Sequence, residues 1–223
     1  LYLLQCLLVP KYASDIKEGA MIKEYYNSEK NHDVLILGDC EVYENISTVT
    51  MWENYGISSY IRGSAEQLIW QSYYLLEDTL KYEKPQVVIV NVLAMTESDA
   101  KNEAYNRMTL DGMKLSKYKI ASIKESMTEE ENMTSYIFPL LRYHSRWSEL
   151  SSEDFRYMWK TPSVTTNGYL MQKGVRPVKT IPKAAPLANY TFSDRNMEYL
   201  DKIYSLCKDN GINLVLMKAP SVY

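Results

Sequence analysis

Glycine, proline, phenylalanine and histidine are all scarce in this chain of 223 residues, which has 8 Gly, 8 Pro, 3 Phe and 2 His. So little Gly and Pro excludes a collagen-like repeat. The three cysteines, Cys6, Cys40 and Cys207, are odd in number and far apart, which excludes both a disulfide framework and a paired-cysteine metal site. Basic residues are not in excess, because 25 Lys and Arg face 28 Asp and Glu. The chain therefore lacks the charge expected of a nucleic-acid-binding protein.

The residues that are abundant indicate a soluble, folded body. Hydrophobic residues make up 46% and charged residues 24% of the chain, which is ordinary globular usage and argues against disorder or a multi-span membrane protein. A mass of 25.9 kDa suits one α/β domain. Tyrosine is the outlier with 20 copies. We expect Tyr to replace Phe in the core; wet, carbohydrate-like surfaces are the alternative use of these side chains.

Residues 1–10, LYLLQCLLVP, form an uncharged apolar run that Pro10 ends. The run is too short to span a bilayer. A charged stretch follows it directly, which favours the last turns of an N-terminal signal anchor over a buried N-terminal helix. We therefore expect this run to be the end of a membrane anchor.

Apolar runs and helical periods alternate along the rest of the chain. Continuous apolar runs predict buried strands, and amphipathic periods predict helices. The expected strands are 33–38, 57–62, 86–94 and 212–218, and the expected helices are 14–26, 64–82 and 194–210. This alternation predicts a parallel sheet covered by helices on both faces. Residues 100–192 interrupt it with polar helical stretches to about residue 160 and an irregular loop from 161, and we expect a helical insertion or cap there.

Chemistry-bearing residues follow the expected strands. The first strand leads to Asp39, Cys40 and Glu41, the second to Arg62–Ser64, and the third to Asn91, while the last leads to Lys218 and Pro220. In a doubly wound sheet, the carboxyl ends of the strands gather functional groups. We therefore expect these segments to meet, beside backbone N–H groups that could stabilise an oxyanion.

The segment ILGDCEVYE, residues 36–44, resembles the first block of the SGNH, or GDSL, hydrolase superfamily, with Cys40 in the place of the nucleophilic Ser. Gly63 in YIRGSAEQ is similar to the second-block Gly, and Asn91 in VIVNVLAM to the third-block Asn, both of which help to form the oxyanion hole. With Glu41 after Cys40, the segment is similar to the extracytoplasmic branch of the superfamily, which contains the D-alanyl-lipoteichoic acid transfer and alginate O-acetylation proteins. This similarity implies a protein on the extracytoplasmic face of the membrane. Residues 33–223 also resemble SGNH-like, membrane-anchored proteins of Gram-positive gut bacteria.

This resemblance implies a flavodoxin-like (SGNH) sheet and an esterase or O-acyltransferase that needs no cofactor or metal. The expected substrate is an acylated cell-surface polysaccharide or teichoic acid, and the expected partner is a membrane-bound O-acyltransferase. Cys40 would attack the acyl carbonyl, with Gly63 and Asn91 in the oxyanion hole. Asp39 would support the turn, although its charge should raise the pKa of the Cys40 thiol.

The general base of the family stands in a D-x-x-H pair near the C-terminus, which has no counterpart after Lys218. We expect the pair to lie beyond Tyr223, in a missing C-terminal part, so that these 223 residues alone would be inactive. Of the two His residues, His32 precedes the first strand and should be solvated at the opposite edge. His144, inside the insertion, is a weaker candidate for the base, because a lone His among aromatic residues is usually structural.

A non-catalytic binding module is the alternative interpretation. The Cys in place of Ser and the missing base both fit an SGNH-like shell that holds a glycan or a partner of an acylation system. Structural roles are also expected elsewhere. Arg62 should pair with Glu66 on the sheet rim, Trp70 should pack in the core, and Cys207 should be an inert buried thiol.

Overall fold

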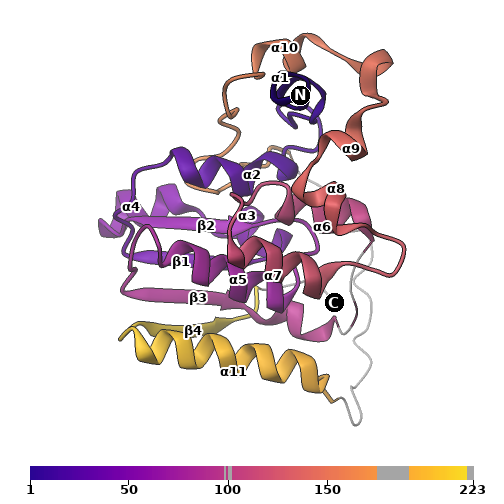
Figure 1. Ribbon diagram of the computed structural model, residues 1–223. Helices are drawn as coiled ribbons and strands as arrows, with labels where there is room; N and C mark the ends of the chain where they lie inside the picture. Colours follow the sequence, from indigo (N-terminus) through magenta and orange to yellow (C-terminus); the bar gives the residue numbers. More distant parts are fainter. Residues whose placement is uncertain (98, 100–101, 175–190, 220–223) are drawn as a thin grey trace, which may run out of the picture.

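The computed structural model describes residues 1–97, 99, 102–174 and 191–219. Four parallel strands form one sheet in the order β2-β1-β3-β4 (Figure 1). Each lies inside a predicted strand or within one residue of it: β1 Val34–Gly38, β2 Ser59–Gly63, β3 Val87–Asn91 and β4 Asn213–Met217. Apolar runs such as VLIL form strands here because helices cover both sides of the sheet. The α/β fold with a flanked parallel sheet is as predicted.

Alternate residues of the strands point to two hydrophobic layers. Leu35 and Leu37 of β1 and Val88 and Val90 of β3 are buried in the larger one, which α5 (Ile69–Thr79), α7 (Lys117–Ser126) and α11 (Asp194–Asp209) cover. Ile36 of β1 points the other way, into a smaller cluster under α3 (Cys40–Asn45). The remaining helices near the sheet are α2 Glu18–Glu24, η1 Tyr25–Asn27, α4 Thr48–Tyr55, η2 Val92–Thr96 and α6 Glu103–Leu110.

Two predicted helices are shorter than expected. The helix predicted for 64–82 begins only at Ile69, because Glu66 has a left-handed φ of 55° that a helix cannot contain. In the same way, Ile16 has a φ of 49°, so the helix predicted for 14–26 begins at Glu18. Ser193 caps α11 by accepting a hydrogen bond from the Asn196 N–H.

The prediction that β4 is buried is wrong. β4 pairs only with β3, and Val215 and Leu216 are 44% and 49% exposed. An apolar run does not reveal whether a strand will lie in the middle of a sheet or at its edge. Although α11 packs on β4, Val215 and Leu216 point to opposite faces of the strand, and neither is fully covered by the described residues.

The stretch 100–192 contains helices, as expected, but they do not form one cap. Here α6 and α7 belong to the main body, since Leu110 and Ile123 are buried in the larger core. The short helices that follow are α8 Met133–Ile137, α9 Leu140–Tyr143, η3 Arg146–Glu149 and α10 Ser152–Arg156. The helices α9 and α10 pack against α1 (Tyr2–Leu8). They stand apart from the sheet, beyond α2 (Figure 1). Part of the predicted 161–192 loop, including Pro177, Pro182 and Pro186, lies outside the described residues.

Tyrosine fills the core, as predicted. Tyr25, Tyr43, Tyr60 and Tyr136 are among the largest fully buried side chains. Tyr25 lies edge-on to Tyr60, with ring centroids 5.1 Å apart, an arrangement that aromatic rings prefer. Trp70 is fully buried and Cys207 almost so, which confirms the structural roles expected for both.

Candidate functional site

The turn between β1 and α3 carries the predicted nucleophile. Asp39 caps α3, because its side chain accepts a hydrogen bond of 3.0 Å from the Glu41 N–H. Asp is a favoured residue at this position for that reason. Cys40 is the first residue of the helix and is half-buried. The sequence thus places Cys40 at the carboxyl edge of the sheet, as predicted.

Asn91, the last residue of β3, holds this turn in place. Its Nδ2 donates to Asp39 Oδ1 at 3.0 Å and to Glu41 Oε2 at 2.9 Å. Its Oδ1 accepts from the Leu93 N–H at 3.2 Å. An Asn side chain has two amide hydrogens, so both are used in this arrangement. Asn91 is 1% exposed and acts here as a clamp on two carboxylates.

Lys218 reaches the same cluster from the end of β4. Its ammonium forms an ion pair with Glu41 Oε1. Groups that follow β1, β3 and β4 are therefore joined through Glu41, which confirms that these segments meet at one edge of the sheet. Sequence reasoning placed Glu41 and Lys218 at this edge but gave neither a partner, because residues 177 positions apart carry no local signal of their pairing.

Gly63, at the end of β2, lies on the other side of the turn, where it pairs with Gly38. A Cβ on Gly63 would stand 2.9 Å from both the Gly38 carbonyl oxygen and Val42 Cγ2. A Cβ on Gly38 would stand 2.7 Å from Asn91 Cβ. Both positions therefore require glycine, because the strand ends and α3 approach so closely.

Arg62 is not on the sheet rim, and the predicted pair with Glu66 is wrong. The guanidinium is fully buried beside α5, where Nη1 donates to Asp78 Oδ2 at 3.0 Å and to Thr79 Oγ1 at 2.8 Å. It also stacks on the Tyr25 ring, 4.2 Å from the centroid. Because successive residues of a strand point to opposite faces, the Arg62 side chain points away from the site that Gly63 borders. Arg62 stabilises the fold from the far side of the site.

The Cys40 thiol is not activated by its described surroundings. Burial, followed by the charges of Asp39, Glu44 and Glu66, raises the pKa of Cys40 to about 11. Burial likewise raises the pKa of Asp39. The expected effect of Asp39 on the thiol is present but second to burial. Since the thiolate is the nucleophile, Cys40 at neutral pH needs a base or a cation to react.

Neither histidine has a hydrogen bond to Cys40 among the described residues. His144 is exposed at the end of α9, and its Nδ1 lies 2.9 Å from the Leu141 carbonyl oxygen; α9 packs on α1 and α8. The expectation that His32 is solvated is wrong. His32 is 8% exposed, and its Nδ1 lies 2.8 Å from Glu83 Oε2. A buried carboxylate after α5 holds it at the amino edge of the sheet, away from Cys40.

A separate polar cavity of about 410 Å³ lies between α2, β2 and the segment 161–167. Its lining includes Glu24, Tyr60, Ser163 and Thr165. Glu24 is almost buried and accepts hydrogen bonds from both Ser163 and Thr165. The lining residues do not include Cys40.

Within the described residues there is no group of three or more His, Cys, Asp or Glu side chains that could hold a metal ion. No protein family, curated protein or solved structure was found to match the chain. Across the same described ranges, we find no helix with the length and apolar character needed to cross a membrane.

Proposed function

We propose that the chain is an SGNH-like esterase or O-acyltransferase with Cys40 in the nucleophile position. One observation carries this proposal: Cys40 follows its Asp39 cap at the carboxyl edge of the sheet, between Gly63 from β2 and Asn91 from β3. The resemblance to the SGNH blocks assigns the same three positions to the nucleophile and the oxyanion hole.

In the proposed reaction, the Cys40 sulfur attacks the acyl carbonyl and its proton passes to a general base. The backbone N–H groups of Cys40 and Gly63 would face the oxyanion, and Asn91 would join them by releasing Asp39 or Glu41. The ester C–O bond then breaks, and the departing alcohol takes the proton from the base. Water or an acceptor hydroxyl next attacks the thioester, which gives hydrolysis or transfer and restores the thiol.

The base would come from the D-x-x-H pair that the resemblance implies. The proposed substrate is an acylated cell-surface polysaccharide or teichoic acid, and a membrane-bound O-acyltransferase is the proposed partner. Residues 1–10 would belong to an anchor that holds the domain on the extracytoplasmic face of the membrane.

A non-catalytic binding module is the second candidate. Two observations favour it: the pKa of Cys40 is about 11, and Asn91 spends both amide hydrogens on carboxylates. In this case the fold would hold a glycan or a partner of the acylation system. The polar cavity beside Glu24 offers hydroxyl and carboxylate groups of the kind that bind sugar hydroxyls.

The two candidates differ in the effect of Cys40→Ala in the full-length protein. The measurement is the amount of ester-linked acyl groups that mild alkali releases from the cell surface, compared among wild type, a gene deletion, Cys40→Ala and Cys207→Ala. An acyltransferase or esterase predicts that Cys40→Ala matches the deletion, while Cys207→Ala matches wild type. If only the deletion changes the ester content, the binding module is correct. If the deletion has no effect, both candidates fail.

A further inference from the structure

The helices α1, α9 and α10, with η3, form a small lobe from residues 1–12 and 138–160, which we term the α1–α10 lobe. The Arg146 guanidinium donates to the Leu8 carbonyl oxygen, and Lys11 pairs with Asp154 at 3.7 Å. These contacts join the two distant segments into one unit. Figure 1 shows this lobe beyond α2, at the end of the molecule farthest from β4.

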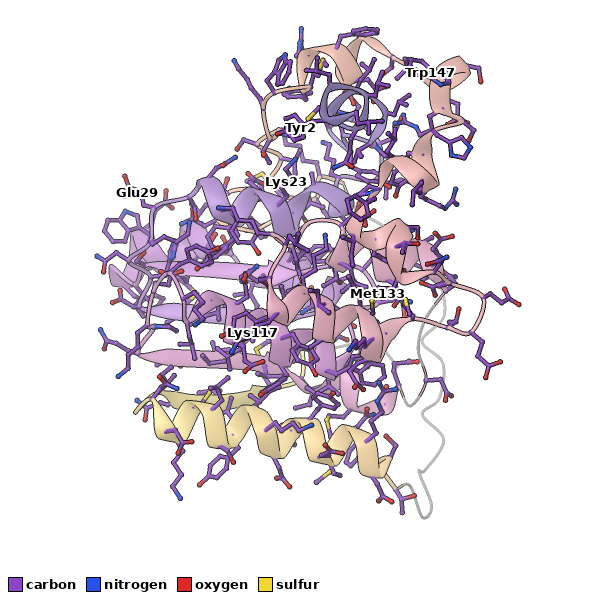
Figure 2. All side chains as sticks on the ribbon, in the orientation of Figure 1. Tyr2, Lys23, Glu29, Lys117, Met133 and Trp147 are labelled. Atoms are coloured by element: carbon purple, nitrogen blue, oxygen red, sulfur yellow. The ribbon has the colours of Figure 1, made fainter. Side chains whose placement is uncertain are left out.

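The α1–α10 lobe exposes many large apolar side chains. Trp147 is 54% and Trp159 66% exposed, and Figure 2 shows Tyr2 and Trp147 on this lobe, away from the sheet. The other strongly exposed members are Leu1, Tyr2, Leu3, Leu4, Phe138, Leu141 and Phe155. Single exposed apolar residues are normal, but a group of this size on a small lobe indicates a surface that binds something.

The α1–α10 lobe carries exposed basic side chains that form no ion pair with the described residues. Between residues 138 and 160, Glu149 and Asp154 pair with Arg146, while Glu153 accepts a hydrogen bond from the neutral Ser14 and forms no ion pair with another described residue. Arg156 and Lys160 are exposed and have no ion pair among the described residues. They flank Trp159 in the sequence FRYMWK.

We propose that the α1–α10 lobe docks on an anionic membrane surface. Trp and Tyr side chains settle at the level of the lipid headgroups because their rings are apolar and their tips are polar. Free Arg and Lys side chains beside them attract anionic headgroups. A protein partner would equally cover apolar residues, but the unpaired cations next to Trp159 favour lipid. This docking concerns residues remote from Cys40 and does not depend on the proposed chemistry.

The test is co-sedimentation of the 223-residue chain with vesicles of equal parts phosphatidylcholine and phosphatidylglycerol, with pure phosphatidylcholine vesicles as the comparison. We expect binding to the anionic vesicles that weakens with added salt. The double variant Trp147→Ser/Trp159→Ser should bind about tenfold more weakly, and Arg156→Gln and Lys160→Gln about fivefold each. Trp52→Ser is the matched control, because Trp52 on α4 is 62% exposed but lies outside the lobe.

Fluorescence quenching by lipids with brominated acyl chains gives a second readout that does not depend on the folding of a drastic variant. Conservative Trp→Phe variants that leave only Trp147 or Trp159 beside the buried Trp70 should be quenched, and the variant that leaves Trp52 should not. The proposal is overturned if the chain ignores anionic vesicles, or if Trp52→Ser weakens binding as much as the double variant. A third outcome also overturns it. If the wild-type chain does not bind vesicles but self-associates in sedimentation velocity, and the double variant does not self-associate, the lobe joins two copies of the chain.

Discussion

Replacing Asn91 with Ala removes the clamp that joins the ends of β1 and β3. The variant loses the hydrogen bonds from Nδ2 to Asp39 and Glu41 and the acceptor of the Leu93 N–H. Asp39 is 8% exposed, so water replaces its lost donor poorly. The change is confined to the turn, because no charge is added and the substitution reduces volume.

The expected cost follows from the kind of bond that is lost. A hydrogen bond to a charged group contributes about 1.5 to 3 kcal/mol, so two of them set an upper range near about 6 kcal/mol. Glu41 keeps its ion pair with Lys218, which lowers the loss on that side. We therefore expect Asn91→Ala to reduce the free energy of unfolding by about 3 to 4 kcal/mol at pH 7.

The cost should depend on pH. The pKa of Asp39 is already raised by burial, and the Asn91 hydrogen bond opposes that rise, so the variant should raise this pKa further. An acid with a higher pKa in the folded state than in the unfolded state holds its proton more tightly when folded. The resulting penalty is absent below the unfolded pKa, about 3.9, and grows as the pH rises through the folded pKa. Asn91→Ala should therefore cost more at pH 7 than at pH 4.

Urea unfolding followed by tryptophan fluorescence, at pH 7 and at pH 4, measures both quantities. Asn196→Ala is the matched control, because Asn196 is equally buried but donates to the neutral carbonyl oxygens of Met95 and Glu97. Its cost should be the same at both values of pH. A cost below about 1 kcal/mol for Asn91→Ala, or one that matches the control in its pH dependence, would refute the role of Asn91 as a clamp on two carboxylates.

Three further predictions concern residues at or next to the ends of β1 and β2. Arg62→Met should lower the free energy of unfolding by about 3 to 5 kcal/mol in thermal or urea unfolding, because it leaves the buried Asp78 carboxylate without its cation. Arg62→Met/Asp78→Leu should recover most of that loss. Gly63→Ala should lower stability by about 1 to 3 kcal/mol, since its Cβ would meet the Gly38 carbonyl oxygen at 2.9 Å; an unchanged melting temperature would contradict the close packing. Alkylation of Cys40 by iodoacetamide, followed by mass spectrometry, should be slow at pH 7 and accelerate with pH until about 11; a rate that is already maximal at pH 8 would show that the thiol is activated.

The strands β1, β3 and β4 could be predicted because each one contains a short apolar run bounded by polar or turn-forming residues. For β1, the run VLIL between Asp33 and Gly38 sufficed. The exposure of β4 could not be predicted, because a residue such as Val215 occurs both in central strands and in edge strands. Position in a sheet depends on which strands pair, and that information is not local.

The candidate site shows the same division. The residue types at the strand ends, Asp39, Cys40 and Asn91, could be read from the sequence once the strands were placed. Their hydrogen bonds could not, because whether Asn91 faces an oxyanion or a carboxylate depends on side-chain geometry. The prediction for Arg62 was wrong because it depended on the face of the strand to which the side chain points. The Arg62 side chain points into the protein, where it contacts Asp78.

The state of Cys40 connects the geometry to the choice between catalysis and binding. Burial and the carboxylates of Asp39, Glu44 and Glu66 stabilise the neutral thiol. A protonated histidine beside the sulfur would act in the opposite direction, because a nearby positive charge favours the thiolate. If a D-x-x-H pair in the full-length protein reaches Cys40, the alkylation profile of that protein should move to lower pH than the profile of residues 1–223. Identical profiles would mean that no base reaches the thiol, and the binding module would then account for the site.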